Sequence, residues 1–387
     1  MNKEDIATIR RQFTLHNEQL NITHLCNVYV QKEAKTMYHY EYEPFEMLES
    51  DTKELFLTNF KKTLSGRIDT KLFPLRWDKT ANNDMQQMLQ TAVKVTERDA
   101  WLDTVLKIAA KCTEEKQYDK DTVLTFIQAE SRNATKKVDI DDAPVSSVDD
   151  VHRFILCSIN ESTLPETALT FDYIEKQFRA NVDVDPIIQL AKPIVGFMFP
   201  TITAGFTNVN EVLFYNHKPN VLDDIFVENV LGCKRASTAK DDKTNFEMIV
   251  SSVANDQIDS ETIHAMYEEI DEIIDENDEE AESIRLDYRD VEQIMKNSGI
   301  QQVDSEQLKT AYESIVPEEN QTLKAMNLLP KNVSIKTDSV KVTLKREHLD
   351  KVTYTTRDGR PRLTIELDED IQIEGFQIEA IQPHSSS

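Results

Sequence analysis

The residues best suited to chemistry in this sequence are three aspartates in the segment VDIDDAP, residues 138–144. Asp139 and Asp141 are two positions apart, so on a strand their carboxylates would share one face and could hold a divalent cation. With Asp142 and the nearby His152, they are the candidate catalytic residues of a metal-dependent phosphoester hydrolase or nuclease. Because the chain contains 70 acidic residues, such pairs are also expected by chance, and we favour turn and capping roles for them.

Two positively charged segments oppose the overall charge of the chain. The first basic segment, residues 61–79, has six Lys or Arg and two Asp; the second, residues 336–362, has eight Lys or Arg and four acids, so each is +4. The candidate interaction residues are Lys61, Lys62, Arg67, Lys71, Arg76 and Trp77 in the first, and Lys341, Lys345, Arg346, Arg357, Arg360 and Arg362 in the second. Basic segments that contain aromatic residues can bind nucleic acid, which is one hypothesis for Lys61, Lys62, Arg67, Lys71 and Arg76. We favour docking on an acidic surface of this chain or of a second copy.

An acidic segment lies between the two basic ones. Residues 256–283 hold 13 acidic residues and no Lys or Arg, which is half of the net charge of −26. Ile263, Met266, Ile270 and Ile274 recur at helical spacing and predict a long acidic amphipathic helix. A net charge of −26 disfavours nonspecific binding to nucleic acid or to anionic membranes, because both repel a negative field.

The sequence contains only 7 glycines, and the closest two, Gly196 and Gly205, are nine positions apart. The motifs GxGxxG, GxxxxGK[ST] and GxSxG therefore cannot occur. They need glycine because the backbone must approach a phosphate closely or turn at positive φ. Standard Rossmann, P-loop, protein-kinase and α/β-hydrolase folds are excluded, and we predict no cofactor apart from the divalent metal considered above.

The four cysteines are isolated in the sequence, and their positions are Cys26, Cys112, Cys157 and Cys233. This spacing is typical of free thiols in a reducing compartment. The N-terminal sequence has no apolar core of the kind found in signal peptides. The longest apolar stretch, residues 194–206, is too short to span a bilayer. We therefore expect a cytoplasmic protein without a membrane partner.

The elements that must position these residues are predicted from periodicity. Helices are predicted at 2–12, 51–64, 83–95, 98–111 and 222–231, and a β-hairpin before the second of them. Strands are predicted at 122–130, 151–160, 169–178, 194–202, 208–217 and 244–253. Residues 151–160 carry apolar side chains on both faces, which is typical of a central strand covered on both sides. The fold class is α+β, a mainly antiparallel β-sheet domain with N-terminal helices plus a smaller C-terminal α+β domain.

The predicted domain organisation follows the charge pattern. Residues 1–255 form the scaffold domain, 256–283 an acidic helical linker, 284–383 a small domain of a helix pair and β-hairpins, and 384–387 a disordered tail. In this small domain Asp358–Gly359 is a strong signal for a turn between two strands.

Several stretches resemble one protein family. They are FKKTLSG, IDDAPVSSVDDVHRFILCSI, GFMFPTI, EVLFYNHK and VENVLGC in the scaffold domain, and KTDSVKVTLK and RDGRPRLTIELDEDIQIEGFQI near the C-terminus. Together they resemble an uncharacterised domain-of-unknown-function family of Gram-positive bacteria, over nearly the whole chain. The resemblance implies a bacterial cytoplasmic protein with this two-part organisation, and it implies no activity, cofactor or site residue.

The sequence therefore supports three functional hypotheses. The first is a non-enzymatic cytoplasmic interaction or regulatory protein, which binds a protein partner or a second copy through charge-segregated surfaces. The second is the metal-dependent phosphoester hydrolase or nuclease, and the third is the nucleic-acid-binding protein. We favour the first, because every common catalytic motif is missing from a sequence with strongly segregated charge.

Overall fold

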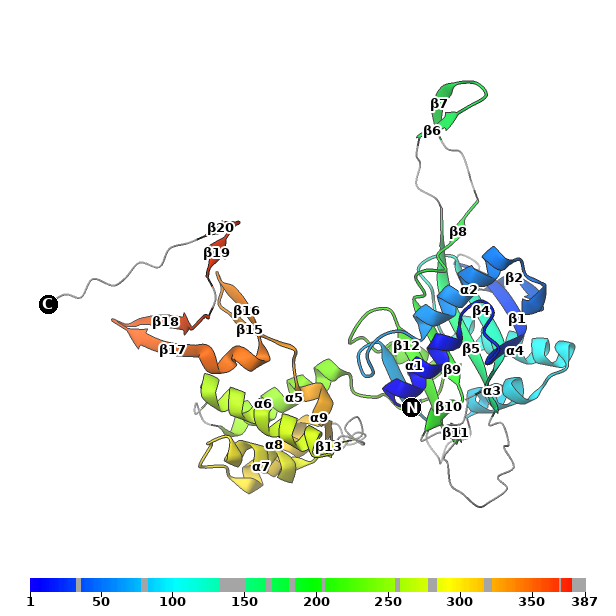
Figure 1. The fold of residues 1–387 in the computed structure, drawn as a ribbon. Coiled ribbons are helices and arrows are strands. Elements are labelled where there is room, and N and C mark those ends of the chain that lie inside the picture. Colours follow the sequence, from blue (N-terminus) through cyan, green and yellow to red (C-terminus); the bar gives the residue numbers. More distant parts are fainter. Residues whose placement is uncertain are drawn as a thin grey trace, which may run out of the picture. The chain divides into compact units, whose positions relative to one another are not determined.

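The structure is a computed structural model of the whole chain. It describes residues 1–32, 36–77, 83–132, 151–164, 169–180, 185–203, 206–254, 258–277, 284–316, 322–368 and 370–377. The chain forms two compact units, Met1–Thr238 and Ala239–Ser387 (Figure 1). No helix of the described residues is long and apolar enough to cross a membrane.

The first unit is built on one antiparallel sheet with the strand order β2-β1-β4-β5-β9-β12-β3, to which β8 adds a short pairing with β5. The strands are β1 Leu20–Gln31, β2 Thr36–Glu43, β3 Leu72–Arg76, β4 Thr122–Arg132, β5 Val151–Thr163, β8 Ile187–Ile188, β9 Val195–Phe199 and β12 Glu211–Asn216. The predicted α+β class with a mainly antiparallel sheet is confirmed.

Helices cover both faces of this sheet (Figure 1). They are α1 Lys3–Gln12, α2 Ser50–Thr63, α3 Asp84–Lys94, α4 Arg98–Glu114 and the π-helix η2 Ile225–Val230. Ile155 and Cys157 of β5 belong to the core beneath α3, α4 and η2, whereas Phe154 and Leu156 belong to the core beneath α1 and α2. The prediction of a central strand covered on both sides is confirmed.

The first unit shows why one glycine is needed and how one helix begins. A Cβ at Gly196 would lie 2.4 Å from Cγ2 of Thr63 and 2.7 Å from the carbonyl oxygen of Cys157, so α2 lies against bare backbone of β9. Asn2 is the N-cap of α1, and its side chain accepts a hydrogen bond from the amide of Asp5 at 2.8 Å.

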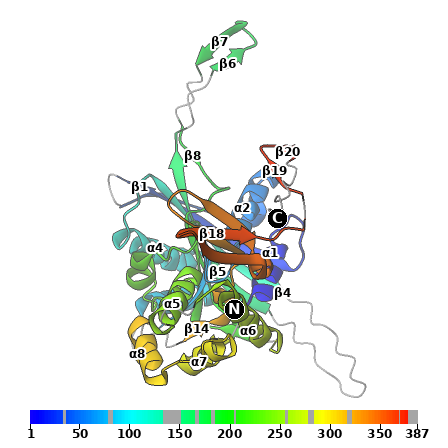
Figure 2. The ribbon, with the colours of Figure 1, turned by 90° about the vertical axis from the view of Figure 1, so that its left-hand side faces the viewer.

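Two small hairpins and a short 3-10 helix complete the first unit, and they are β6 Leu169–Asp172 with β7 Gln177–Ala180, β10 Thr201–Thr203 with β11 Phe206–Asn208, and η1 Phe45–Met47. The predicted strand 169–178 is therefore a hairpin. Figure 2 shows β6 and β7 beyond the end of the sheet.

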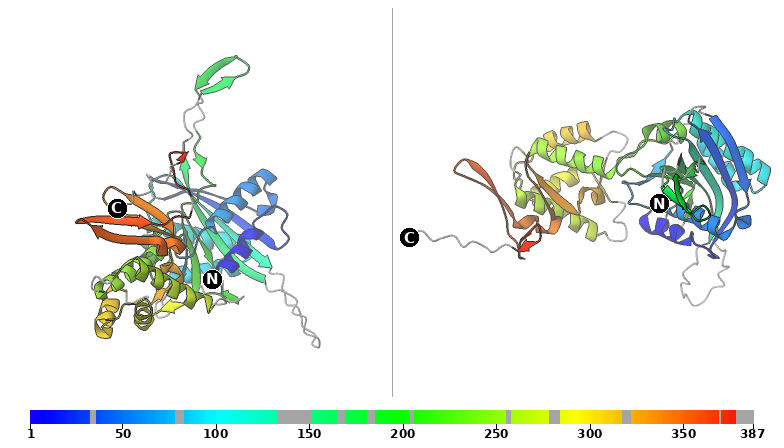
Figure 3. Two further views of the ribbon diagram at one scale, coloured as in Figure 1. Left: turned by 60° about the vertical axis from the view of Figure 1, so that its left-hand side comes forward. Right: turned by 90° about the horizontal axis from the view of Figure 1, so that it is seen from above.

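The second unit is a helical core with attached β-hairpins (Figure 3). Its helices are α5 Ala239–Val253, α6 Ser260–Asp275, α7 Tyr288–Asn297, α8 Ser305–Ile315 and α9 Ala325–Leu328. The strands that pair within it are β13 Arg285–Leu286 with β14 Leu323–Lys324, β15 Asn332–Lys336 with β16 Lys341–Lys345, β17 Val352–Arg357 with β18 Arg360–Ile365, and β19 Gln372–Ile373 with β20 Phe376–Gln377. The 3-10 element η4, Arg346–Lys351, joins β16 to β17.

The strand predicted at 244–253 is wrong, because these residues lie in α5. Phe246, Ile249, Val250 and Val253 recur at helical spacing and pack into the helical core of the second unit. The two units consequently divide after Thr238, before α5. The described part of the acidic segment also differs from a separate linker, since α6 contributes to that core.

Candidate functional site

The aspartates at the centre of the metal hypothesis, Asp139, Asp141 and Asp142, lie outside the described residues. His152 is the second residue of β5 and is buried, with its ring stacked on Phe154 and its Nδ1 3.1 Å from the hydroxyl of Thr207. Burial lowers the pKa of His152 to about 4, and the backbone of Pro200 offsets this only in part. Within the part of the chain that the structure describes, no three His, Cys, Asp or Glu side chains come together as metal ligands.

The first basic segment is built into the sheet of the first unit. Its central residues form β3, which pairs with β12 at the sheet edge. Trp77 lies in the core, and its indole nitrogen donates a hydrogen bond to the carbonyl of Leu231 at 2.7 Å. Trp77, which the sequence pattern assigns to the interaction residues, is therefore a core residue.

Arg76 of this segment is paired with a buried carboxylate. Its Nε lies 3.3 Å from Oε2 of Glu211, and the other oxygen of Glu211 accepts hydrogen bonds from the ammonium of Met1 at 2.7 Å and the hydroxyl of Thr201 at 3.0 Å. Glu211 is only 2% exposed. A buried carboxylate needs such partners, so Arg76 has a structural role. Nothing in the sequence pattern singled out Glu211.

The other candidate cations of the first segment lie at the end of α2 and in the residues that follow it. Lys61 and Lys62 lie in the last turn of that helix, where a positive charge is favourable to the helix dipole. Lys62 and Arg67 are exposed, and Lys61 and Lys71 are half-buried. Two of these four side chains are therefore exposed and two are half-buried. They are divided between α2 and the residues that follow it.

The second basic segment divides into a docked part and an outward part. Arg346 forms an ion pair with Asp271 of α6, and Lys345 forms one with Glu347 at 3.2 Å. Lys341 begins β16 and is exposed. This segment and the acidic helix α6 therefore contact each other inside one unit.

Apolar contacts fix the base of the β17–β18 hairpin on α6. Val352 and Leu349 form a buried cluster with Tyr267 of α6, and Ile365 packs against it. The hydroxyl of Ser260 donates a hydrogen bond to the carbonyl of Val352 at 2.6 Å. The hairpin thus starts from a fixed base.

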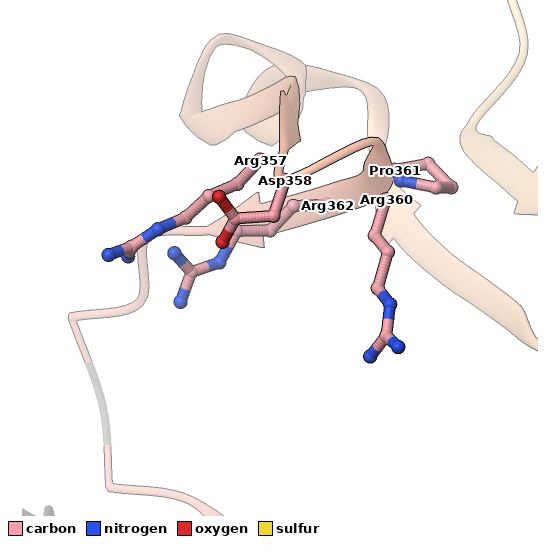
Figure 4. A pocket seen from close by; sticks show the side chains of 5 residues that line it. All are labelled: Arg357, Asp358, Arg360, Pro361 and Arg362. Carbon is pink, nitrogen blue, oxygen red and sulfur yellow. The ribbon is translucent and has the colours of Figure 1, made fainter.

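The tip of this hairpin carries three arginines, Arg357, Arg360 and Arg362, which we call the arginine hairpin. Arg357 pairs across the strands with Arg360, and Arg362 is two positions further along β18, so alternation places all three on one face. They are exposed, and within the described residues none of the three forms an ion pair. With Asp358 and Pro361 they line an open hollow of about 510 Å³ (Figure 4).

The turn at the tip has the geometry that its sequence predicts. Asp358 and Gly359 have φ values of 53° and 71°, and positive φ at both central residues is typical of the type I′ turn that matches the twist of two paired strands. The turn therefore keeps the two strands in register, and with them the three arginines.

Comparison with known proteins places the chain in a family. No curated protein and no solved structure matches it. The family described as a domain of unknown function (DUF4317) matches residues 1–376, which is nearly the whole chain. The chain therefore belongs to this DUF4317 family.

Proposed function

We propose that this protein is a non-enzymatic interaction protein of the bacterial cytoplasm, and that the arginine hairpin binds an acidic surface on a protein partner. The observation that carries the proposal is the set of three exposed guanidinium groups on one face of an anchored hairpin, none with an ion-pair partner among the described residues. The cytoplasm is supported by the four cysteines, which are buried free thiols.

The surroundings of the hairpin favour a directed contact. Residues 239–387 contain 16 Lys or Arg and 34 Asp or Glu, so the second unit has a net charge of 16 − 34 = −18. Against this charge, three neighbouring arginines are a local exception. Charged groups in complementary arrangement steer a partner and fix its orientation, so an acidic partner would bind at the hairpin and be repelled elsewhere.

The chemistry of arginine suits a carboxylate partner. Its planar guanidinium binds a carboxylate through two parallel hydrogen bonds. The same basic segment already pairs an arginine with a carboxylate inside the chain, where Nη2 of Arg346 donates a hydrogen bond to Asp271. A partner with clustered Asp or Glu would extend that mode of binding to the tip of the hairpin.

Nucleic-acid binding is the second candidate, and the shape of the hairpin favours it. A two-stranded ribbon can enter the major groove of DNA, and guanidinium groups bind phosphates as well as carboxylates. The charge of −18 on the same unit opposes a long polyanion. We therefore rank it below the protein partner.

The test measures binding of the full chain to an immobilised poly-glutamate peptide and, separately, to a random-sequence DNA duplex. We expect the wild type to bind the peptide, and the variant Arg357→Gln/Arg360→Gln/Arg362→Gln to bind roughly tenfold to a hundredfold more weakly, since each exposed charge pair contributes about 0.5–1 kcal/mol. The matched variant with lysine at the three positions keeps the charge and should retain part of the binding.

Two results would contradict the proposal. One is equal binding of the peptide by the wild type and the glutamine variant. The other is tighter binding of DNA than of the peptide with a steep loss on adding salt, which would put the nucleic-acid function in its place.

A further inference from the structure

A second exposed surface lies in the first unit, on the β6–β7 hairpin, and it is apolar. Its described side chains include five large apolar residues that are exposed, and these are Leu169, Phe171, Tyr173, Ile174 and Phe178. We call this element the apolar arm. Tyr173 and Ile174, at its tip, are 85% and 89% exposed, which is close to the exposure of a residue in an unfolded chain.

The aromatic residues of the arm pack only on one another among the described residues. Phe171 pairs across the strands with Phe178, their ring centroids 5.2 Å apart, and Tyr173 lies 5.2 Å from Phe171 on the edge. Further along the chain, Ile187 and Ile188 of β8 pair with the end of β5, so the chain returns to the sheet there. The arm is thus an ordered hairpin without a core of its own.

Such a hairpin needs a partner for physical reasons. An isolated two-stranded hairpin is marginally stable in water, and clustered exposed apolar side chains mark an interaction surface. The described hairpin also pairs β6 only with β7, so both of its outer edges offer backbone groups to a further strand.

We propose that the apolar arm is a self-association element that packs against the same arm of a second copy. A two-fold contact uses the same patch on both copies, and the apolar arm has this self-complementary chemistry. Covering about 100 Å² on each of the five side chains would bury about 1,000 Å² over the two arms, which is the lower limit for a specific interface and indicates a weak dimer.

The charge of the chain disfavours contact between two copies through their acidic surfaces. Two copies carry a net charge of −26 each and repel one another. The five apolar side chains of the arm carry no charge, so their contact with the same side chains of a second copy adds no repulsion of its own. Because charge repulsion is screened within about 8 Å at physiological salt, such a dimer can form where a contact between acidic faces cannot.

The test is sedimentation velocity of the full chain over a roughly hundredfold range of concentration that reaches the high micromolar, as a weak interface requires. We expect a monomer–dimer equilibrium that strengthens on going from 0.15 to about 0.5 M salt, because salt screens the repulsion and leaves apolar contact in place. This salt response is opposite to that of the arginine hairpin, so the two proposals can fail separately.

Variants locate the contact. Tyr173→Ser/Ile174→Ser should weaken dimerisation at least tenfold, whereas the control Phe206→Ser, which changes an equally apolar residue that is 75% exposed on β11, should dimerise like the wild type. A wild type that stays monomeric, or a tip variant that dimerises normally, would overturn the proposal.

Crosslinking tests that arm meets arm. The native cysteines are buried, and burial raises the pKa of Cys26 and Cys112 to about 12, so they react slowly with maleimides. In the variant Ile174→Cys a short bis-maleimide should join two copies through position 174. A dimer that forms without this crosslink would show that the arm docks elsewhere and would also overturn the proposal.

Discussion

The two basic segments carry the same net charge of +4 in the sequence, yet the structure uses them in opposite ways. Residues of the first segment form an edge strand, place Trp77 in the core and pair Arg76 with the buried Glu211. The second segment ends in a hairpin whose three arginines have no ion-pair partner among the described residues. The charge of a segment therefore does not show whether that charge is available to a partner.

Apolar residues decide the difference. In the first segment Leu72, Phe73 and Leu75 are buried and hold β3 on the sheet. In the β17–β18 hairpin the buried residue is Val352 at the base, and Tyr354 and Leu363 further out are exposed. Strand β3 of the first segment is thus fixed along its length, and the β17–β18 hairpin only at its base on α6.

The largest expected effect comes from breaking the first segment. Trp77→Ala removes a buried aromatic side chain and its hydrogen bond to Leu231, and should lower the free energy of unfolding by about 3–5 kcal/mol. The fluorescence of Trp101, which is buried in the same unit, follows urea unfolding in this variant. A loss below about 1 kcal/mol would show that the segment is not part of the core.

The next largest effect is expected from pH, which should change the stability of the first unit through His152. The folded pKa of His152 is about 4 against about 6.5 for free histidine, so the unfolded state takes up the proton first as the pH falls. Stability present above pH 6.5 is therefore lost towards pH 4, by roughly 2–3 kcal/mol. Urea unfolding at both pH values, compared with His152→Gln, isolates this loss. A difference that does not change with pH would contradict it. The guanidinium groups of the arginine hairpin stay charged over this pH range, so the hairpin itself does not titrate with His152.

A smaller effect is expected where the second segment docks on α6. The Arg346–Asp271 pair is partly exposed, so a double-mutant cycle with Arg346→Gln and Asp271→Asn should give a coupling of about 0.5–1 kcal/mol. Both single variants and the double variant are measured by thermal unfolding. A coupling of zero would leave the apolar cluster around Tyr267 and the Ser260–Val352 hydrogen bond to fix this region on α6.

The smallest effect on stability is expected at the arginine hairpin itself. Arg357→Gln/Arg360→Gln/Arg362→Gln removes exposed charges that form no ion pair among the described residues, so the free energy of unfolding should stay within about 0.5 kcal/mol of the wild type. Thermal unfolding checks this. A larger loss would mean that these arginines have a structural role like that of Arg76.

The sequence predicts the sheet well and the site only in part. The strand at 151–160 and the hairpin around Asp358–Gly359 follow from local alternation and turn chemistry, and both are confirmed. The sequence does not predict β3, because this strand is short and carries Pro74. The prediction for residues 244–253 is wrong because Phe246, Met248 and Val250 alternate as in a strand, although Phe246, Ile249, Val250 and Val253 also recur at helical spacing.

The candidate site shows the same limit. Eleven Lys and Arg residues were selected by their charge, together with the aromatic Trp77. Charge alone could not distinguish Arg76, which pairs with Glu211 of a strand distant in sequence, from Arg360, which forms no ion pair among the described residues. That separation depends on pairing across 135 positions of the chain. A local sequence pattern cannot predict such a contact.

The most direct test of the central claim compares two matched variants in one binding measurement. The full chain with Arg357→Gln/Arg360→Gln/Arg362→Gln and the full chain with Lys61→Gln/Lys62→Gln/Lys71→Gln lose the same charge from different basic segments. Their affinities for the poly-glutamate peptide are measured at 0.15 M salt. We predict that the hairpin variant binds at least about tenfold more weakly and that the lysine variant binds within about twofold of the wild type. Equal losses in both variants would contradict the claim that the arginine hairpin is the contact surface.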